Sequence, residues 1–332
     1  MFSTPKQSSN GALTVSCRQL NLRYKLYGRI YTAILPPLQY GHLVFLHQVL
    51  DFNRPRANSP TFKLSQRPSF RYSDTRFIEV ITEKYMADAA RPQIRGRFTS
   101  CELVRREELT EDLVKFWIKP AQDYVFKPGQ YCTIGVGGIE RPYSISSSPD
   151  EEDIELFIEI VPVEHGGHLT PLLDHQQVGA EMTLRPRAKG IFILQPQFKH
   201  HIFVGTVTGV VPYISMLRKF LNDPSWPEPA DGIEREDYTF HVLEGASYLD
   251  EFGYDEELNE LADKHDFISF YPSVSRPTEE RNASWAGAKG RINLLVEDYL
   301  EKLGIDPKET CVYACGHPQM IEDVGERMEN TD

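Results

Sequence analysis

Apolar and polar residues alternate in short runs over residues 96–194, and turn signals separate most of these runs. Lys-Pro-Gly at 127–129 and Val-Gly at 178–179 are two such signals, because glycine and proline favour turns. A period of two is typical of β-strands with one buried face. The pattern therefore predicts a small antiparallel β-barrel. Its strands are expected at 96–104, 113–118, 127–136, 141–148, 154–162 and 180–194.

The pattern changes after a polar segment at 195–200, where apolar strands begin to alternate with helices. Strands are expected at 201–206, 238–245, 267–272 and 311–314, and helices from Pro212, over 250–264, from Arg291 and from Pro318. In the third of these helices Ile292, Leu295 and Tyr299 fall on one stripe, which is a helical period. Strand–helix alternation favours a parallel sheet in a doubly wound α/β domain.

The first 93 residues show neither period for any sustained length. They are rich in Arg and Ser, and no acidic residue precedes Asp51. This composition resembles an organelle transit peptide, but the simpler interpretation, which we favour, is that translation starts at Met86. A chain of 332 residues suits two ordinary domains, since single cores seldom exceed roughly 250 residues. We expect a poorly structured extension at 1–93, a barrel domain at 94–197 and an α/β domain at 198–332.

Charge and composition exclude several classes of protein. Residues 1–97 hold 15 Lys and Arg against 5 Asp and Glu, whereas the rest of the chain holds 21 against 43. Such an acidic body argues against a nucleic-acid groove, which needs clustered cations. No run of 18 apolar residues offers a membrane span. We expect a cytoplasmic monomer, or an organellar protein if the extension directs import.

The five cysteines are scattered, and their odd number suits neither a disulfide framework nor a metal site. The expectation is a reducing compartment and no bound metal. The cysteines are Cys17, Cys101, Cys132, Cys311 and Cys315.

The stretch Arg-Pro-Tyr-Ser at 141–144 brings three kinds of chemistry together. In a strand Arg141 and Tyr143 share one face, while Ser144 lies on the other side. A guanidinium, a phenol ring and a hydroxyl suit a flat, anionic cofactor with polar edges. An ordinary exposed barrel strand remains the alternative from these residues alone.

Six motifs in order along the chain resemble the ferredoxin–NADP(+) reductase family, and most closely the bacterial flavodoxin/ferredoxin reductases. The resemblance covers roughly residues 95–332, and each motif alone is weak. They are RPYS at 141–144, GGHLTPLL at 166–173, GTVTGVVPYISMLR at 205–218, SVSRP at 273–277, KGRI at 289–292 and CGHPQM at 315–320.

The resemblance implies an FAD site in the barrel. It implies that Arg141 binds the pyrophosphate, that Tyr143 packs on the flavin and that Ser144 bonds to flavin N5 as a catalytic residue. The loop at 166–170 would donate to the FAD phosphates. The full implied set is Arg141, Pro142, Tyr143, Ser144, Phe157, Gly167, His168, Leu169 and Thr170.

The resemblance also implies an NADP site in the α/β domain. A second catalytic residue, Cys315, would lie beside the nicotinamide, and Ser275 with Arg276 would receive the 2′-phosphate. The implied binding residues are Thr208, Gly209, Ser275, Arg276, Arg291 and Gly316.

The sequence departs from the family pattern at four places, of which one is Val211, where alanine or glycine is common. Val207 and Ser247 replace a glycine and an arginine that are common there, and only twelve residues follow the CGHPQM motif. Since a β-branched residue avoids positive φ, we expect an extended loop at Val207.

By resemblance the protein is a two-domain flavoenzyme that passes hydride between NADP(H) and FAD, and single electrons to or from ferredoxin or flavodoxin. Other readings stay open: the reductase component of an oxygenase, or a free flavin reductase. The departures at Val207 and Ser247 would also suit an FAD-binding electron-transfer subunit with weak pyridine-nucleotide turnover. A mis-called reading frame without stable function is the last alternative.

Overall fold

The chain forms two compact units, Met1–Leu38 and Gln39–Asp332. In the first unit β1 (Tyr24–Leu26) pairs antiparallel with β2 (Arg29–Tyr31). Most of the extension expected at 1–93 lies outside the described residues, so the proposed domain division stays a prediction. The computed structural model describes residues 24–26, 29–31, 42–45 and 98–330.

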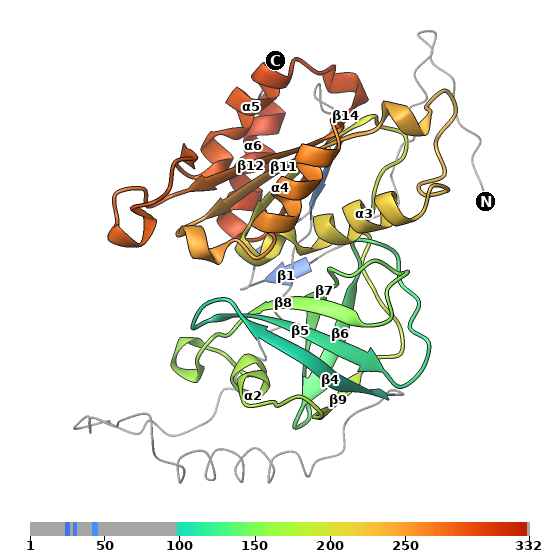
Figure 1. Ribbon diagram of the computed structural model, residues 1–332, viewed down its shortest axis with the longest axis vertical. Helices are drawn as coiled ribbons and strands as arrows, with labels where there is room; N and C mark the ends of the chain where they lie inside the picture. Colours follow the sequence, from blue (N-terminus) through green and yellow to red (C-terminus); the bar gives the residue numbers. More distant parts are fainter. Residues whose placement is uncertain (1–23, 27–28, 32–41, 46–97, 331–332) are drawn as a thin grey trace. The chain divides into compact units, whose positions relative to one another are not determined.

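The antiparallel barrel predicted from the alternating runs is confirmed (Figure 1). Six strands lie in the order β7-β6-β9-β4-β5-β8. One apolar side chain in each alternating pair points into a common core that includes Leu103, Phe116 and Ile134. The strands are β4 (Thr99–Glu108), β5 (Leu113–Pro120), β6 (Tyr131–Val136), β7 (Ile139–Ser144), β8 (Ile154–Glu159) and β9 (Glu181–Leu184).

Strand β8 departs from simple alternation, since its first five residues are all buried. Leu156 and Ile158 face the barrel core, whereas Phe157 belongs to the core of the α/β domain. A strand that is covered on both faces buries consecutive residues. Strand β8 therefore lies where the barrel and the α/β domain meet.

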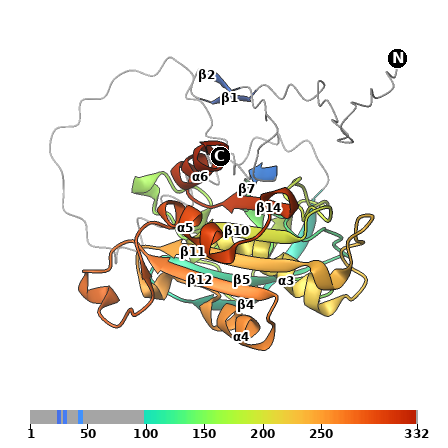
Figure 2. The ribbon, with the colours of Figure 1, turned by 90° about the horizontal axis from the view of Figure 1, so that it is seen from above.

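The second part of the chain forms the predicted parallel sheet, with helices on both faces (Figure 2). Its strands lie in the order β13-β12-β11-β10-β14-β3. The central strands are continuous buried runs, as expected of parallel strands that helices cover on both sides. They are β10 (His200–Thr206), β11 (Thr239–Ala246), β12 (Ile268–Val274), β13 (Ala288–Lys289), β14 (Thr310–Cys315) and β3 (His42–Phe45).

Among the described residues, four helices of at least eight residues accompany this sheet, and Figure 2 shows α5 and α6 on the face opposite α4. Within the part of the chain that the structure describes, no helix combines the length and hydrophobicity that a membrane crossing requires. The helices are α3 (Val211–Asn222), α4 (Asp255–Lys264), α5 (Val296–Leu303) and α6 (Pro318–Asn330).

The edge strand β3 was missed by sequence reasoning. It pairs parallel to β14, with His42 opposite Cys311 and Phe45 opposite Ala314. Four residues are too few to show a period, and their pairing partner lies more than 250 residues later in the chain. No local signal could have predicted this contact.

Two helices begin later than the sequence pattern predicted. Helix α4 starts at Asp255 rather than at 250, because Leu249–Glu251 forms a separate 3-10 turn (η4). Helix α5 starts at Val296, since Arg291 is extended and a 3-10 turn, Ile292–Leu294 (η6), follows it. Helix boundaries depend on such local turns, which the apolar period does not reveal.

Candidate functional site

A pocket of about 270 Å³ lies between the barrel and the start of α3. Its walls come from the ends of β7 and β8, from the loop before residue 171 and from the turn after β10. All of the residues that the resemblance assigned to FAD line this pocket, together with Thr208 and Val211. Segments far apart in sequence therefore converge on one place. The other lining residues are Ile158, Glu159, Val161, His165 and Gly166.

A larger hollow, about 560 Å³, lies beside α5 and the start of β14. It contains none of the residues expected at the site, and its polar lining is largely acidic. An acidic lining disfavours an anionic cofactor, so the smaller pocket is the better candidate site. The lining residues of the larger hollow are Glu297, Asp298, Leu300, Glu301, Gly304, Ile305, Pro307, Thr310 and Val312.

The end of β7 supplies the polar groups of the pocket. Ser144 is 6% exposed, and its Oγ has no hydrogen-bond partner among the described residues. Leaving a buried hydroxyl unpaired costs about 1–3 kcal/mol, so an external partner for this group is expected. Arg141, on the same strand, donates one bond to the Glu140 carbonyl at 2.8 Å and lines the pocket. These residues fit a ligand with both anionic and hydrogen-bonding edges.

Tyr143 stands opposite Cys132 in the β6–β7 pair and contributes its ring to the pocket. Burial raises the pKa of its phenol, and the nearby Arg141 offsets only part of that rise. The hydroxyl therefore stays protonated, and the residue presents an aromatic surface without charge.

The loop that carries the expected phosphate contacts is held tightly to the segment that follows β8. A Cβ on Gly167 would lie 1.7 Å from the carbonyl oxygen of Val161, so only glycine fits. The Thr170 hydroxyl accepts from the Val161 N–H at 3.0 Å and donates to its carbonyl at 2.9 Å. Since that hydroxyl is already paired, Thr170 can serve a phosphate best through its backbone N–H.

Phe157 connects the pocket to the α/β domain. Its ring meets that of Tyr254 edge to face, with 5.8 Å between the centroids. A Cβ on Gly253 would lie 2.6 Å from the Phe157 ring, so the backbone before α4 packs directly on it. The ring is 4% exposed, and its position depends on contacts from both domains.

The turn after β10 contradicts one sequence expectation. Val207 has a φ of 48° and opens a 3-10 turn, Val207–Val210 (η2), so the prediction of an extended loop is wrong. A non-glycine residue in this region stores about 1–3 kcal/mol of strain. Packing offsets it, because Val207 lies against the apolar cluster of Ala246, Phe252 and Val274.

The carboxyl ends of β10 and β14 touch through two glycines. A Cβ on Gly209 would lie 2.2 Å from the Cys315 carbonyl oxygen, and one on Gly316 would lie 2.2 Å from Thr206 Oγ1. Thr206 Oγ1 also accepts from the His317 N–H at 2.8 Å. The two loops expected to hold a coenzyme therefore form one backbone surface.

Cys315 is 3% exposed at the end of β14. Burial raises the pKa of its thiol to about 12. The group is therefore a neutral thiol at ordinary pH and has no thiolate character.

Arg276 lies apart from the pocket, at the exposed carboxyl edge of the sheet. Its guanidinium donates to Tyr248 Oη at 2.7 Å and lies 5.2 Å from the Tyr248 ring centroid. Ser275 precedes it, and its N–H donates to the Ala246 carbonyl at 2.9 Å. Arg291 follows β13, which pairs with the end of β12, so the three residues lie on neighbouring strand ends.

Sequence reasoning missed Arg281. Its guanidinium lies 4.3 Å from the Tyr248 ring centroid and pairs with Asp250 at 2.8 Å. It therefore stands beside the position of Ser247, where an arginine had been expected. Only the folding of the loop after β12 brings it there, so its sequence position carried no signal.

Comparisons with known proteins agree with this arrangement. A family model described as the oxidoreductase NAD-binding domain matches residues 203–326. The flavodoxin/ferredoxin–NADP reductase of Rhodobacter capsulatus is 28% identical, over 67% of this chain and 82% of that protein. The reductase component of propane 2-monooxygenase from Mycolicibacterium goodii is also 28% identical, over 67% of this chain and 60% of that protein.

This chain thus spans less than two thirds of the length of some curated relatives that it matches. Among solved structures, a ferredoxin NADP+ reductase from Neisseria gonorrhoeae with bound FAD and NADP superposes with a TM-score of 0.58. The two are 23% identical, and the match covers 70% of this chain and 90% of the other. Likeness at this identity supports the two-domain fold described above.

Proposed function

We propose that the chain belongs to the ferredoxin–NADP(+) reductase family and is an FAD-dependent oxidoreductase, which its similarity to the oxidoreductase NAD-binding domain and to flavodoxin/ferredoxin–NADP reductases supports. It transfers hydride between NADP(H) and FAD and exchanges single electrons with a ferredoxin or flavodoxin. One observation carries the proposal: the residues expected to hold FAD converge on one pocket, in which the buried Ser144 hydroxyl has no partner within the described part of the chain.

The residues of the pocket suit the parts of this cofactor. Arg141 provides a fixed positive charge for the pyrophosphate, and Tyr143 and Phe157 provide apolar surface beside the ring system. The Ser144 hydroxyl would hold the polar edge of the ring system through a hydrogen bond. When bound, FAD supplies the conversion between two-electron and one-electron transfer.

The protein's own part in hydride transfer is to position the coenzyme and exclude water. Gly209 and Gly316 let the loops after β10 and β14 pack closely against each other, which fixes the backbone on which the coenzyme would lie. Cys315 adds a neutral thiol, so that no fixed charge opposes the movement of hydride. Phe157 closes the pocket toward α4.

The coenzyme is proposed to be NADP(H). Ser275, Arg276 and Arg291 lie on neighbouring strand ends and can receive a 2′-phosphate, and Arg281 adds a further guanidinium. Glu279 lies 3.8 Å from Arg276, and Asp250 pairs with Arg281, so part of this positive charge is already balanced. We therefore expect a preference over NADH of about ten- to a hundredfold, below the maximum that two full ionic hydrogen bonds would give.

Addition of FAD to the cofactor-free protein tests the proposal. We expect stoichiometric binding that the Arg141→Ala substitution weakens by at least about tenfold, the worth of one charge-assisted hydrogen bond. The control is Arg105→Ala, since that arginine pairs with Glu107 on β4 and does not line the pocket. If FAD fails to bind, or if both variants bind alike, the pocket assignment is wrong.

A second candidate is the reductase component of an oxygenase. The similarity to the propane 2-monooxygenase reductase component favours it, because that relative is as similar as the flavodoxin/ferredoxin reductase. The two candidates share the flavin chemistry and differ in the electron acceptor. Turnover with purified ferredoxin and flavodoxin supports the first function; reduction of neither carrier, with rapid reduction of a dye, would favour the second.

A further inference from the structure

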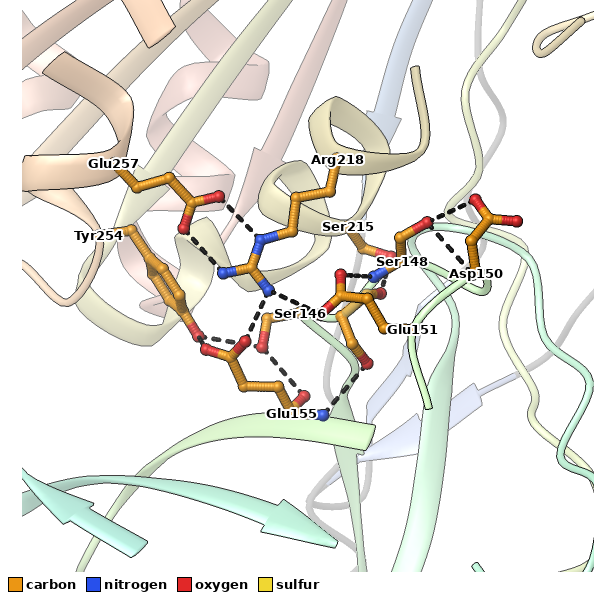
Figure 3. Close-up of polar contacts among 10 residues, drawn as sticks. Ser146, Ser148, Asp150, Glu151, Glu155, Ser215, Arg218, Tyr254 and Glu257 are labelled. Carbon is orange, nitrogen blue, oxygen red and sulfur yellow. Dashed lines mark hydrogen bonds and ion pairs between the residues drawn. The ribbon is translucent and has the colours of Figure 1, made fainter. Parts of the chain in front are cut away.

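A buried polar junction joins β8 to helices α3 and α4 (Figure 3). At its centre Glu155 is 3% exposed and pairs with Arg218, where the Glu155 Oε2 to guanidinium nitrogen distance is 2.6 Å. Arg218 also binds Glu257 through two nitrogens, at 2.8 and 2.7 Å. Desolvation opposes the charge of Arg218, but its bonds to these carboxylates outweigh it and raise its pKa. One arginine thus holds the barrel and α4 together.

A tyrosine completes the junction. The Tyr254 hydroxyl lies 2.8 Å from Glu155 Oε1 and 2.9 Å from Ser146 Oγ. Ser146 Oγ in turn donates to the backbone carbonyl of Glu155 at 2.9 Å. The segment that follows β7 and the strand β8 are therefore bonded to each other and to the residue before α4.

The junction is next to the residues that form the pocket wall. Glu155 and Phe157 are two apart on β8, so their side chains share one face, and Tyr254 contacts both. Ser146 is likewise two residues after Ser144, whose hydroxyl enters the pocket. Glu155 is thus linked to Phe157 through β8 and Tyr254, and to Ser144 through the bonds of Ser146.

Helix α3 carries the other side of the junction. Val211, its first residue, lines the pocket, and Arg218 follows after seven residues. Seven residues are almost two full turns, so Val211 and Arg218 lie on the same stripe of the helix. Ser215 lies near this stripe and donates to the Ser147 carbonyl at 2.8 Å. This side of α3 therefore faces the barrel from the pocket to the junction.

We propose that Arg218 and Glu155 are positioning residues, which set the separation between the pocket wall on β7 and β8 and the wall formed by the start of α3. The inference rests on the proposed function, since these walls would hold FAD and the coenzyme. Apolar contacts allow sliding, whereas hydrogen-bonded ion pairs fix direction as well as distance. Glu257 holds the Arg218 guanidinium through two nitrogens, a third nitrogen binds Glu155 Oε2, and the Tyr254 hydroxyl binds Glu155 Oε1. A misplacement of about 1 Å between reacting groups can cost roughly a hundredfold in rate.

The test compares Glu155→Gln, Arg218→Gln and Arg218→Lys with the unchanged chain. With NADPH in excess and oxygen excluded, we expect the two Gln variants to reduce bound FAD at least about tenfold more slowly. The NADPH concentration for half-maximal rate should change less than about threefold, because neither residue is expected to contact the coenzyme. Arg218→Lys keeps the charge and should recover part of the rate.

Two readouts separate positioning from simple stabilisation. The circular dichroism of bound flavin in the visible range should change in the Gln variants, because it reports the surroundings of the ring. Amide hydrogen exchange in the cofactor-free protein should speed up at 144–147 and 155–158. Arg327→Gln is the control, since its pair with Glu297 at 2.8 Å joins α6 to α5 and takes no part in the pocket.

Three outcomes would overturn the inference: a lower melting temperature with unchanged flavin reduction and dichroism, an equal loss of rate in Arg327→Gln, or unchanged exchange at the two segments. A different result tests the proposed function itself. If the unchanged chain binds no FAD, or NADPH fails to reduce it, that function is refuted, while the exchange measurement still shows whether the junction holds the two strands.

Discussion

Substitution of Gly316 by alanine should disrupt the coenzyme side of the site. Gly316 has a φ of +128°, and an added Cβ would lie 2.2 Å from Thr206 Oγ1 and 2.9 Å from Thr206 N. Strain in such a conformation costs about 1–3 kcal/mol, and overpacking adds about 1–3 kcal/mol. The expected destabilisation is therefore about 2–6 kcal/mol.

Gly304 provides a matched control, because it also has a positive φ, +59°, but nothing lies within 4 Å of its added Cβ. Gly304→Ala should cost only the conformational penalty of about 1–2 kcal/mol. Since 1 kcal/mol shifts the melting temperature of a domain of this size by roughly 2–4 °C, Gly316→Ala should melt several degrees below Gly304→Ala.

The assay combines thermal unfolding with flavin reduction by NADPH. In Gly316→Ala the loop after β14 must move away from Thr206, which weakens the bond from the His317 N–H. We expect the NADPH concentration for half-maximal reduction to rise, while FAD stays bound because its pocket lies on the barrel side. Equal melting temperatures and equal NADPH dependence in the two variants would refute the close packing of these loops as the reason for glycine.

The other predictions concern the pocket, the coenzyme and pH. Ser144→Ala removes an unpaired buried hydroxyl, so the cofactor-free protein should melt no lower than the unchanged chain, whereas flavin reduction should slow by at least about tenfold; a marked loss of stability would show that the hydroxyl already has a partner. Arg276→Ala should lower kcat/KM for NADPH by at least about tenfold and leave kcat/KM for NADH nearly unchanged. Arg281→Gln should lower kcat/KM for NADPH by less, since Asp250 already balances the charge of Arg281. Equal losses with both coenzymes would contradict the 2′-phosphate assignment. Burial lowers the pKa of His201 to about 3. As the pH falls below about 6.5, the unfolded chain therefore binds a proton at this histidine, whereas the folded chain does not. The contribution of the buried, neutral His201 to stability is therefore complete above that pH and is lost progressively toward pH 3. In His201→Phe the new ring can stack on Phe240, and the melting temperature should fall less steeply with acid.

Sequence patterns predicted the strands and helices whose formation depends on the residues within them. Alternation and turn residues located the barrel strands, and unbroken apolar runs located β10 and β14, because burial on one or both faces sets those patterns. Edge strand β3 could not be predicted, since its only support is a partner distant in sequence. The same holds for Arg281, which reaches Tyr248 through the path of its loop.

Two features of the site show where residue-level reasoning fell short. The conformational preference of valine predicted an extended turn at Val207, but packing against Phe252 and its neighbours outweighs that preference. Arg218 ends the motif at 205–218, but no spacing links it to Glu155 or Glu257, because the three residues come from elements that meet only in the folded chain. Motif spacing located the groups that face the pocket, and it missed those that hold the pocket walls in place.

The visible absorption spectrum of the purified protein, recorded before and after anaerobic addition of NADPH, tests the central claim most directly. The account predicts flavin absorption bands that lose most of their intensity when NADPH is added, since both cofactors then act at one site. Absence of these bands even after incubation with FAD, or bands that NADPH leaves unchanged, would contradict it.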